Sequence, residues 1–301
     1  MTAPSLPKPR QAPAWRQVTG VVARHGDYGA GHRWLDLELP AVAPRPTPGQ
    51  FVQLLLESPS PVLLPRPMSV ASVAARRSRL ELGFLYAPVG SGTRALARLE
   101  RGDRVEALSP LGRGYPLGTA GTPVLVAGGR GVAPLLFAAD ALARAGRRCE
   151  FFFGARDRAH LVGLDEARRR LDRMGSRLHL ATDDGSRGFH GTVMGLLDRL
   201  AKRLPQPLVI HACGPHAMLK AVASWGLARR VPAYLAMESI MACGTGVCRG
   251  CPLARSESAR ASYGRTSAGP PPSLFGNREY AMCCTEGPVF AAEDLDWERV
   301  E

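Results

Sequence analysis

Residues 124–134 read VLVAGGRGVAP, and this stretch has the pattern of a strand, a turn and a helix in succession. Its aliphatic run indicates a buried strand, the glycines at 128–131 indicate a turn, and the apolar residues that follow, with a proline in the first turn, indicate a helix. Further strand patterns lie at residues 149–153, 177–181 and 208–212, and helix patterns at 133–145, 165–174 and 193–204. This alternation predicts a parallel α/β domain.

Three of the four predicted strands end in glycine-rich or polar turns. These turns are residues 128–131, Thr182-Asp183-Asp184-Gly185-Ser186 and Cys213-Gly214-Pro215. Open α/β sheets bind ligands at the carboxyl ends of their strands, so we predict a shared dinucleotide site. Its predicted residues are Gly129, Gly131, Cys213, Gly214 and Pro215. A glycine turn can also do no more than connect a strand to a helix, and Cys213 can simply fill space.

The chain before residue 118 has a different pattern. Short β segments are separated by turn residues such as Pro48-Gly49, which predicts a small antiparallel β-barrel. Within it, Arg66 and Ser69 lie three residues apart on an extended stretch, where arginine can bind a phosphate and serine can reach a flavin ring. Such a pair often marks only a solvated strand edge. The turn Gly90-Ser91-Gly92-Thr93 strengthens the prediction, because a glycine turn before a helix favours anions.

Five of the seven cysteines lie between residues 243 and 284. The spacing Cys243-x4-Cys248-x2-Cys251, with a later cysteine, is typical of plant-type [2Fe–2S] ligation. Glycines in this loop allow a tight turn whose N–H groups point at the sulfurs. A structural zinc ion is the alternative, but zinc sites usually present paired C-x2-C motifs and the second pair is missing. The spacing leaves open whether Cys283 or Cys284 is the fourth ligand.

Composition excludes several classes of protein. A chain of 301 residues with 45% hydrophobic residues can form two or three domains, which excludes a disordered or collagen-like protein. The net charge is +13, but all except three of the 39 basic residues are scattered arginines, so we predict no nucleic-acid binding. The sequence contains neither an apolar run of about 18 to 20 residues nor an apolar signal peptide, which predicts a cytoplasmic protein without membrane contact.

These motifs together resemble the ferredoxin reductase-like flavoproteins and, within them, the electron-transfer subunits of heteromeric dihydroorotate dehydrogenases. The resemblance extends from about residue 15 to residue 290. It is carried by Pro48–Phe51, Arg66–Ser69, Gly92-Thr93, Pro110–Tyr115, Gly131–Pro134, Asp183–Ser186, Cys213–Pro215, Glu238–Cys251 and Cys284–Phe290. The last two motifs separate these subunits from other reductases.

The resemblance implies three domains: an antiparallel β-barrel that binds FAD (15–118), an α/β domain that binds NAD (119–236) and a small [2Fe–2S] domain (237–301). It assigns FAD contacts to Arg66, Pro67, Met68, Ser69, Leu85, Tyr86, Ala87, Gly92 and Thr93. It assigns the cluster ligands to Cys243, Cys248, Cys251 and Cys284, and its closing C-x2-G-P-V-F motif selects Cys284 over Cys283.

Three features depart from the family pattern. Ala87 stands where an arginine is usual, and Arg130 replaces an apolar residue in the nicotinamide turn. The 32 residues between Cys251 and Cys284 exceed the usual gap, and the excess coincides with residues 256–277, whose composition predicts a flexible excursion. An insertion at this place is tolerable because the entropy of loop closure rises slowly with length.

The function implied by the resemblance is electron transfer between NAD and a dihydroorotate-oxidising catalytic subunit, through FAD and the cluster, in pyrimidine biosynthesis. We expect no catalytic acid or base, because hydride transfer depends chiefly on stacking geometry. The alternatives are a reductase subunit of a hydrogenase, sulfide-handling or oxygenase complex, and an iron–sulfur redox sensor without turnover. The dinucleotide signals at the strand ends favour turnover over sensing.

Overall fold

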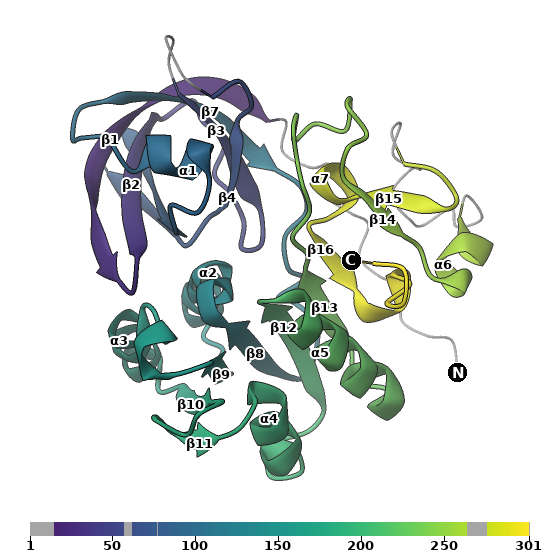
Figure 1. Cartoon of the computed structure of the whole chain (residues 1–301). Coiled ribbons are helices and arrows are strands. Elements are labelled where there is room, and N and C mark those ends of the chain that lie inside the picture. Colours follow the sequence, from purple (N-terminus) through teal and green to yellow (C-terminus); the bar gives the residue numbers. More distant parts are fainter. Residues whose placement is uncertain (1–14, 57–61, 77, 264–275, 301) are drawn as a thin grey trace.

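The computed structural model describes residues 15–56, 62–76, 78–263 and 276–300. Its N-terminal part is a seven-stranded antiparallel sheet curled into a half-barrel (Figure 1). The strands are β1 (Arg16–Gly29), β2 (His32–Pro40), β3 (Phe51–Leu56), β4 (Arg66–Ser69), β5 (Ser72–Arg76), β6 (Arg79–Tyr86) and β7 (Arg104–Leu111), with helix α1 (Ser91–Leu96) before β7. They pair in the order β4-β3-β7-β1-β2-β6-β5, which places β4 and β5 at the two edges of the sheet.

The middle of the chain forms the predicted α/β layer. Its strands are β8 (Thr122–Gly128), β9 (Glu150–Ala155), β10 (Arg177–Thr182), β11 (Phe189–His190), β12 (Leu208–Cys213) and β13 (Ala233–Ala236). Its helices are α2 (Val132–Arg144), α3 (Leu164–Met174), α4 (Val193–Ala201) and α5 (His216–Arg229), with short 3-10 turns at Gly129–Gly131 and Arg158–His160. The order β11-β10-β9-β8-β12-β13 is parallel throughout, so the carboxyl ends of these strands share one edge.

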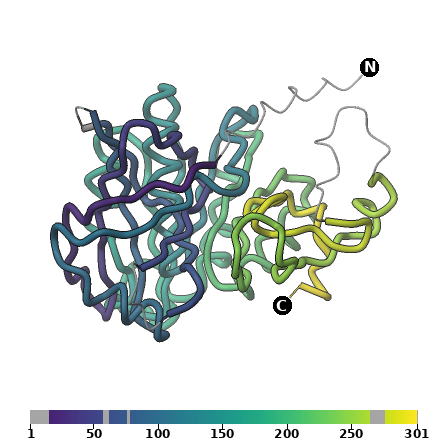
Figure 2. Tube along the Cα trace, turned by 90° about the horizontal axis from the view of Figure 1, so that it is seen from above, coloured from purple at the N-terminus to yellow at the C-terminus, as the bar shows by residue number. Residues whose placement is uncertain are grey.

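The C-terminal region packs at the β13 edge of this sheet, beside the half-barrel (Figure 1). It contains the two-stranded sheet β14 (Pro252–Ala254) and β15 (Tyr280–Met282), helices α6 (Glu257–Ser262) and α7 (Cys283–Glu286), strand β16 (Val289–Ala291) and a 3-10 turn at Ala292–Asp294. Figure 2 shows this region at one end of the molecule and the half-barrel at the other. Strand β16 pairs antiparallel with β13 and makes the central sheet a mixed one.

Apolar packing joins the three regions. One core joins the inner side chains of α4, α5 and β12 to the C-terminal residues Cys251, Cys284, Phe290 and Trp297. A second core places barrel residues such as Trp34 and Leu85 against helix α2. A buried hydrogen bond from the Tyr115 hydroxyl to the Ala212 carbonyl, 2.9 Å long, ties the end of the barrel to the middle of the molecule.

The elements agree with the sequence patterns in kind and differ in detail. The predicted barrel is a half-barrel, and the predicted parallel sheet is mixed, because β16 comes from residues in which no periodicity was visible. Part of the segment predicted to be a flexible excursion forms helix α6. The hydroxyl of Ser256 caps this helix by accepting a hydrogen bond from the backbone N–H of Ala259. Residues 264–275 of the same segment lie outside the described residues. In the described part of the chain, no helix has the length and apolar character to cross a bilayer.

Candidate functional site

The glycine turn after β8 is held in direct contact with the end of β12. A methyl group on Gly131 would lie only 2.0 Å from the carbonyl oxygen of Cys213, so glycine is required there by the approach of two backbones. Gly214 is also close to the turn, because its added methyl would lie 3.0 Å from the Cα of Gly128. Gly129 has φ of +52° and open space around it. The structure therefore brings together the strand ends predicted to bind the dinucleotide.

Cys213 lies at the centre of this contact and is almost completely buried. Burial raises the pKa of its thiol far above the usual range, so the side chain stays neutral. Pro215 follows Gly214 and precedes helix α5. Arg130, the unusual residue of the turn, is exposed to solvent. The turn thus presents glycine backbone and a neutral thiol, with one arginine beside them at the surface.

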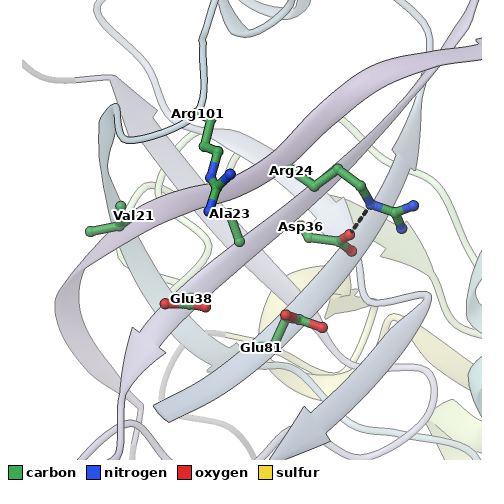
Figure 3. A pocket seen from close by; sticks show the side chains of 7 residues that line it. All are labelled: Val21, Ala23, Arg24, Asp36, Glu38, Glu81 and Arg101. Carbon is green, nitrogen blue, oxygen red and sulfur yellow. Dashed lines mark hydrogen bonds and ion pairs between the residues drawn. The ribbon is translucent and has the colours of Figure 1, made fainter. Parts of the chain in front are cut away.

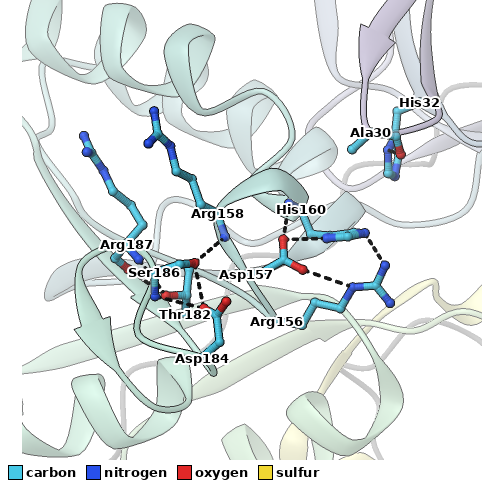
Figure 4. A network of polar contacts seen from close by, with 10 residues as sticks. All are labelled: Ala30, His32, Arg156, Asp157, Arg158, His160, Thr182, Asp184, Ser186 and Arg187. Carbon is cyan, nitrogen blue, oxygen red and sulfur yellow. Dashed lines mark hydrogen bonds and ion pairs between the residues drawn. The ribbon is translucent and has the colours of Figure 1, made fainter.

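The polar loop after β10 lies beside the segment after β9, at the same edge of the sheet (Figure 4). The Ser186 hydroxyl donates to Asp184 Oδ1 over 2.7 Å and accepts from the backbone N–H of Arg158 over 2.8 Å. His160 Nδ1 lies 2.7 Å from Asp157 Oδ1, and this hydrogen bond lowers the pKa of Asp157. The bond between Ser186 and Arg158 thus joins the loop after β10 to the segment after β9.

The predicted flavin residues lie on β4, on the end of β6 and at the start of α1. On β4, Met68 is buried, whereas Pro67 and Ser69 are exposed. The Arg66 side chain lies over Gly92, where an added methyl would come within 2.7 Å of Arg66 Cδ. The guanidinium group of Arg66 donates to the carbonyl oxygen of Pro65 over 3.0 Å. The structure therefore places Arg66 against the turn that sequence analysis paired with it.

The end of β6 supplies Leu85 and Tyr86, both buried, followed by the half-buried Ala87. The Tyr86 hydroxyl lies 2.8 Å from Nε2 of His25, whose Nδ1 lies 2.7 Å from the carbonyl oxygen of Leu99. Burial raises the pKa of Tyr86 to about 12. His25 was not among the residues predicted from the sequence, because no local motif connects it with Tyr86, 61 positions away along the chain.

Thr93 stabilises the turn before α1 through hydrogen bonds between its hydroxyl and the backbone of Gly90. Its hydroxyl accepts from the backbone N–H of Gly90 over 3.0 Å and lies 3.2 Å from the Gly90 carbonyl oxygen. The contact between Arg66 and Gly92 brings two groups of predicted flavin residues together: those on β4 and those around α1.

The cysteine loop has the backbone character expected of a thiolate site. The N–H groups of Thr245 and Cys248 point at the sulfur of Cys243, at 3.4 and 3.5 Å, and the N–H of Gly250 points at the sulfur of Cys248 at 3.4 Å. Burial alone would raise the pKa of Cys243, but these hydrogen bonds outweigh it and lower that pKa to about 6. N–H donors of this kind stabilise negative charge on sulfur.

The two cysteines of the doublet have different surroundings. The sulfur of Cys284 lies 3.3 Å from that of Cys251, whose pKa is lowered to about 7 by this hydrogen bond. The sulfur of Cys283 instead faces the carbonyl oxygen of Met237, 3.9 Å away, and burial raises its pKa strongly. Among the described residues, no three His, Cys, Asp or Glu side chains are arranged to hold one metal ion. A [2Fe–2S] cluster, however, needs two cysteines for each of two irons, and the 3.3 Å between the sulfurs of Cys251 and Cys284 brings two of the predicted ligands together.

A buried ion pair supports the Cys251–Cys284 pair. The guanidinium group of Arg255, just after β14, contacts the carboxylate of Glu286, at the end of α7. Glu286 also accepts a 3.0 Å hydrogen bond from the backbone N–H of Met282. Both charged side chains are nearly buried, so they rigidly connect the two segments that carry these cysteines. This ion pair was not predicted from the sequence, because Arg255 and Glu286 lie 31 residues apart, at the two ends of the long insertion.

One cavity of the half-barrel lies away from the predicted site residues. A cavity of about 630 Å³ on the outer face of β1, β2 and β6 is lined by Val21, Ala23, Arg24, Asp36, Glu38, Glu81 and Arg101 (Figure 3). Arg24 and Asp36 form a 2.7 Å ion pair within it. None of the predicted flavin, nicotinamide or cluster residues lines this cavity, so it is separate from the candidate site.

Comparison with known proteins identifies the family. Residues 125–224 match the oxidoreductase NAD-binding domain family. The chain is 33% identical over 266 residues to the dihydroorotate dehydrogenase B (NAD(+)) electron transfer subunit of Desulforamulus reducens, covering 88% of this chain and 92% of that protein. The chain belongs to this family of electron transfer subunits. The resemblance found in the motifs is therefore confirmed.

Another dihydroorotate dehydrogenase B electron transfer subunit, from Bacillus caldolyticus, is 33% identical over 253 residues and covers 82% of this chain and 86% of that protein. Among solved structures, an NADH-dependent reduced ferredoxin-NADP oxidoreductase superposes with a TM-score of 0.75 at 25% identity, covering 93% of this chain and 91% of that one. A cytochrome P450 reductase from Amycolatopsis superposes with a TM-score of 0.58 at 28% identity, covering 72% and 67%. The half-barrel and mixed sheet are thus the ferredoxin-reductase-like fold that the resemblance implied.

Proposed function

We propose that this chain is the electron-transfer subunit of a dihydroorotate dehydrogenase B, an NAD-linked flavin and iron–sulfur oxidoreductase of pyrimidine biosynthesis. Membership of the family and the strand-end glycine turns support this function. The observation that carries the proposal is the contact between the cysteine loop and the half-barrel. Gly244, next to Cys243, lies against Gln53 of β3, the strand that pairs with the flavin strand β4.

The residues present fit three cofactors. The Arg66 guanidinium group, held against the turn at Gly92, is suited to bind an FAD phosphate. The close backbone approach of Gly131 to Cys213 leaves a flat surface of backbone on which a nicotinamide can lie. N–H groups directed at cysteine sulfurs suit a [2Fe–2S] cluster. When bound, these groups supply hydride and single-electron transfer, and the protein supplies position and electrostatics.

Each region of the chain has one role in this proposal. Residues 15–118 bind FAD through Arg66–Ser69, Leu85–Ala87, Gly92 and Thr93, and residues 119–236 bind NAD through Gly129, Gly131 and Cys213–Pro215. Residues 237–301 hold the cluster, with Cys243 and Cys248 on one iron and Cys251 and Cys284 on the other. Arg255 and Glu286 keep the second pair of cysteines aligned.

The proposed partner is a catalytic subunit that oxidises dihydroorotate. Cys248 and Val247 are exposed on the cysteine loop, which leaves the loop accessible to a second protein. The net positive charge favours an acidic docking face on that partner. The proposal assigns no described element to dihydroorotate itself, and it places the assembly in the cytoplasm.

The test uses the full chain purified anaerobically. Analysis should find one FAD, two irons and two sulfides per chain, and NADH should reduce an artificial acceptor. The chain alone should not form orotate, whereas adding the catalytic subunit from the same source should restore NAD-linked orotate formation. Zinc in place of iron and sulfide, or orotate formation by the chain alone, would contradict the proposal. Binding to a hydrogenase or oxygenase component instead would leave only a reductase function.

A further inference from the structure

Gln53 occupies the junction between the flavin strand and the cysteine loop. It lies on β3, where it is paired with Pro67 of β4 on one side and with Leu108 of β7 on the other. Its side chain is only 1% exposed. Strand β4 carries the predicted flavin contacts, so Gln53 is one strand away from them.

The side chain of Gln53 contacts the cysteine loop directly. Its Nε2 donates to the carbonyl oxygen of Met241 over 3.4 Å, and it bridges positions 188 residues apart in the chain. A methyl group on Gly244 would lie 2.7 Å from Gln53 Cγ and 3.0 Å from Gln53 Nε2. Gly244 has φ of +73°, so its backbone bends around the carboxamide. Cys243, a predicted ligand, lies between the two loop residues that Gln53 contacts.

One polar atom of this carboxamide has no partner. Among the described residues, Gln53 Oε1 is buried and forms no hydrogen bond. An unpaired buried polar group costs about 1–3 kcal/mol, and an apolar side chain of the same size would avoid that cost. Thr285 Oγ1, next to Cys284, is buried and unpaired in the same way. Both atoms belong to residues close to predicted ligands, because Thr285 follows Cys284 in the chain and Gln53 contacts Met241 and Gly244 around Cys243.

A second buried glutamine on the same side of the barrel provides the contrast. Gln50 accepts from the backbone N–H of Thr47 over 2.8 Å and donates to the Gly112 carbonyl oxygen over 2.7 Å. Its carboxamide is paired at both ends and stabilises the fold. Gln53 has one long hydrogen bond and one orphan atom, so stability does not account for its polarity. A buried polar group that does not stabilise the fold is most often found at a functional site, and Gln53 is such a group.

We propose that Gln53 is a positioning residue for electron transfer, whose carboxamide holds the cysteine loop against the flavin strand and keeps the cluster's surroundings polar. This inference rests on the proposed function, because it needs both cofactors in place. Hydrogen bonds and polarity around an iron–sulfur cluster determine its reduction potential. Replacing the carboxamide by an apolar chain should lower that potential, since apolar surroundings disfavour the added negative charge of the reduced cluster.

The experiment compares Gln53→Met with the matched control Gln50→Met in the full chain. The Gln53 variant should keep its iron and FAD content and a thermal unfolding temperature equal to or above that of the unmodified chain, because the substitution removes an orphan. Its cluster midpoint potential, from an EPR-monitored redox titration, should become more negative. Its NADH-driven cluster reduction, followed by stopped flow, should slow by about tenfold or more. The Gln50 variant should unfold at a lower temperature with unchanged potential and reduction rate.

The outcomes separate the inference from the proposed function. If Gln53→Met unfolds at a lower temperature with unchanged potential and reduction rate, Gln53 is structural and the inference is wrong while the function stands. Gln53→Asn, which keeps a neutral carboxamide, should retain the potential better than Gln53→Met, and the reverse order would also overturn the inference. If the unmodified chain itself contains no iron and sulfide, the proposed function fails first.

Discussion

Gly131→Ala should disable the nicotinamide turn by steric displacement alone. The backbone at Gly131 has φ of −59°, which alanine adopts without strain, but the added methyl would lie 2.0 Å from the Cys213 carbonyl oxygen. Carbon and oxygen atoms in such contacts ordinarily stay about 3.3 Å apart, so the turn must move by roughly 1.3 Å. A displacement of about 1 Å can cost about 100-fold in rate. We therefore expect kcat/KM for NADH to fall about 100-fold, equivalent to about 2.7 kcal/mol.

The assay is NADH-dependent reduction of an artificial acceptor by the purified chain, with FAD content measured to show that the flavin remains bound. Gly26→Ala is the matched control, because nothing lies within 4 Å of its added methyl and its φ is not positive. Gly214→Ala should have an intermediate effect, since its shortest contact, at 2.6 Å, is with the flexible end of Met218. The reasoning is refuted if folded Gly131→Ala retains the kinetics of the Gly26 control, or if Gly214→Ala is the more damaging change.

The two remaining predictions concern the cysteine doublet and a buried histidine. Cys284→Ser should abolish or strongly shift the visible and EPR signals of the cluster, whereas Cys283→Ser should leave them nearly intact, because only Cys284 lies beside Cys251; the opposite pattern would reverse the assignment. His211 is stacked on Tyr234, and burial lowers its pKa to about 3. Its unfolded pKa is about 6.5, so the unfolded state binds more protons and the free energy of unfolding decreases as pH falls below 6.5, by about 3 kcal/mol at pH 4.5. Chemical unfolding of His211→Phe at pH 7 and pH 4.5 should show a smaller loss, and an unchanged loss would exclude His211 as its source.

Local patterns alone predicted much of the molecule. The strand, glycine turn and helix at residues 124–134 are present, as β8, the turn at Gly129–Gly131 and α2, because hydrophobic periodicity and turn residues act over short distances. The boundaries of α3 and α4 differ from their predicted ranges by three residues or fewer. Helix α5 and strand β13 were missed. Arginine, tryptophan and glycine interrupt the pattern of α5, and β13 has only four residues.

The candidate site was predictable only in part. The C-x4-C-x2-C spacing predicted a thiolate loop, and the structure supplies N–H groups directed at its sulfurs. The resemblance, and not the residues alone, chose Cys284 over Cys283. The structure supports that choice, because helix α7 turns one sulfur toward Cys251 and the other toward Met237. The orientation of the two sulfurs depends on how helix α7 packs, and the position of two adjacent cysteines in the sequence does not reveal it.

The sequence by itself determined the type of each region: a β-rich first part, an alternating α/β middle and a cysteine-rich end. Each follows from residue periodicity, turn chemistry and ligand spacing, which are local properties of the chain. Only the tertiary structure decided that β16 pairs with β13, that Arg255 pairs with Glu286, and that Gln53 reaches the cysteine loop. These contacts join residues tens to nearly two hundred positions apart. They form only when the burial of shared apolar surface brings separate regions together, so no local pattern records them.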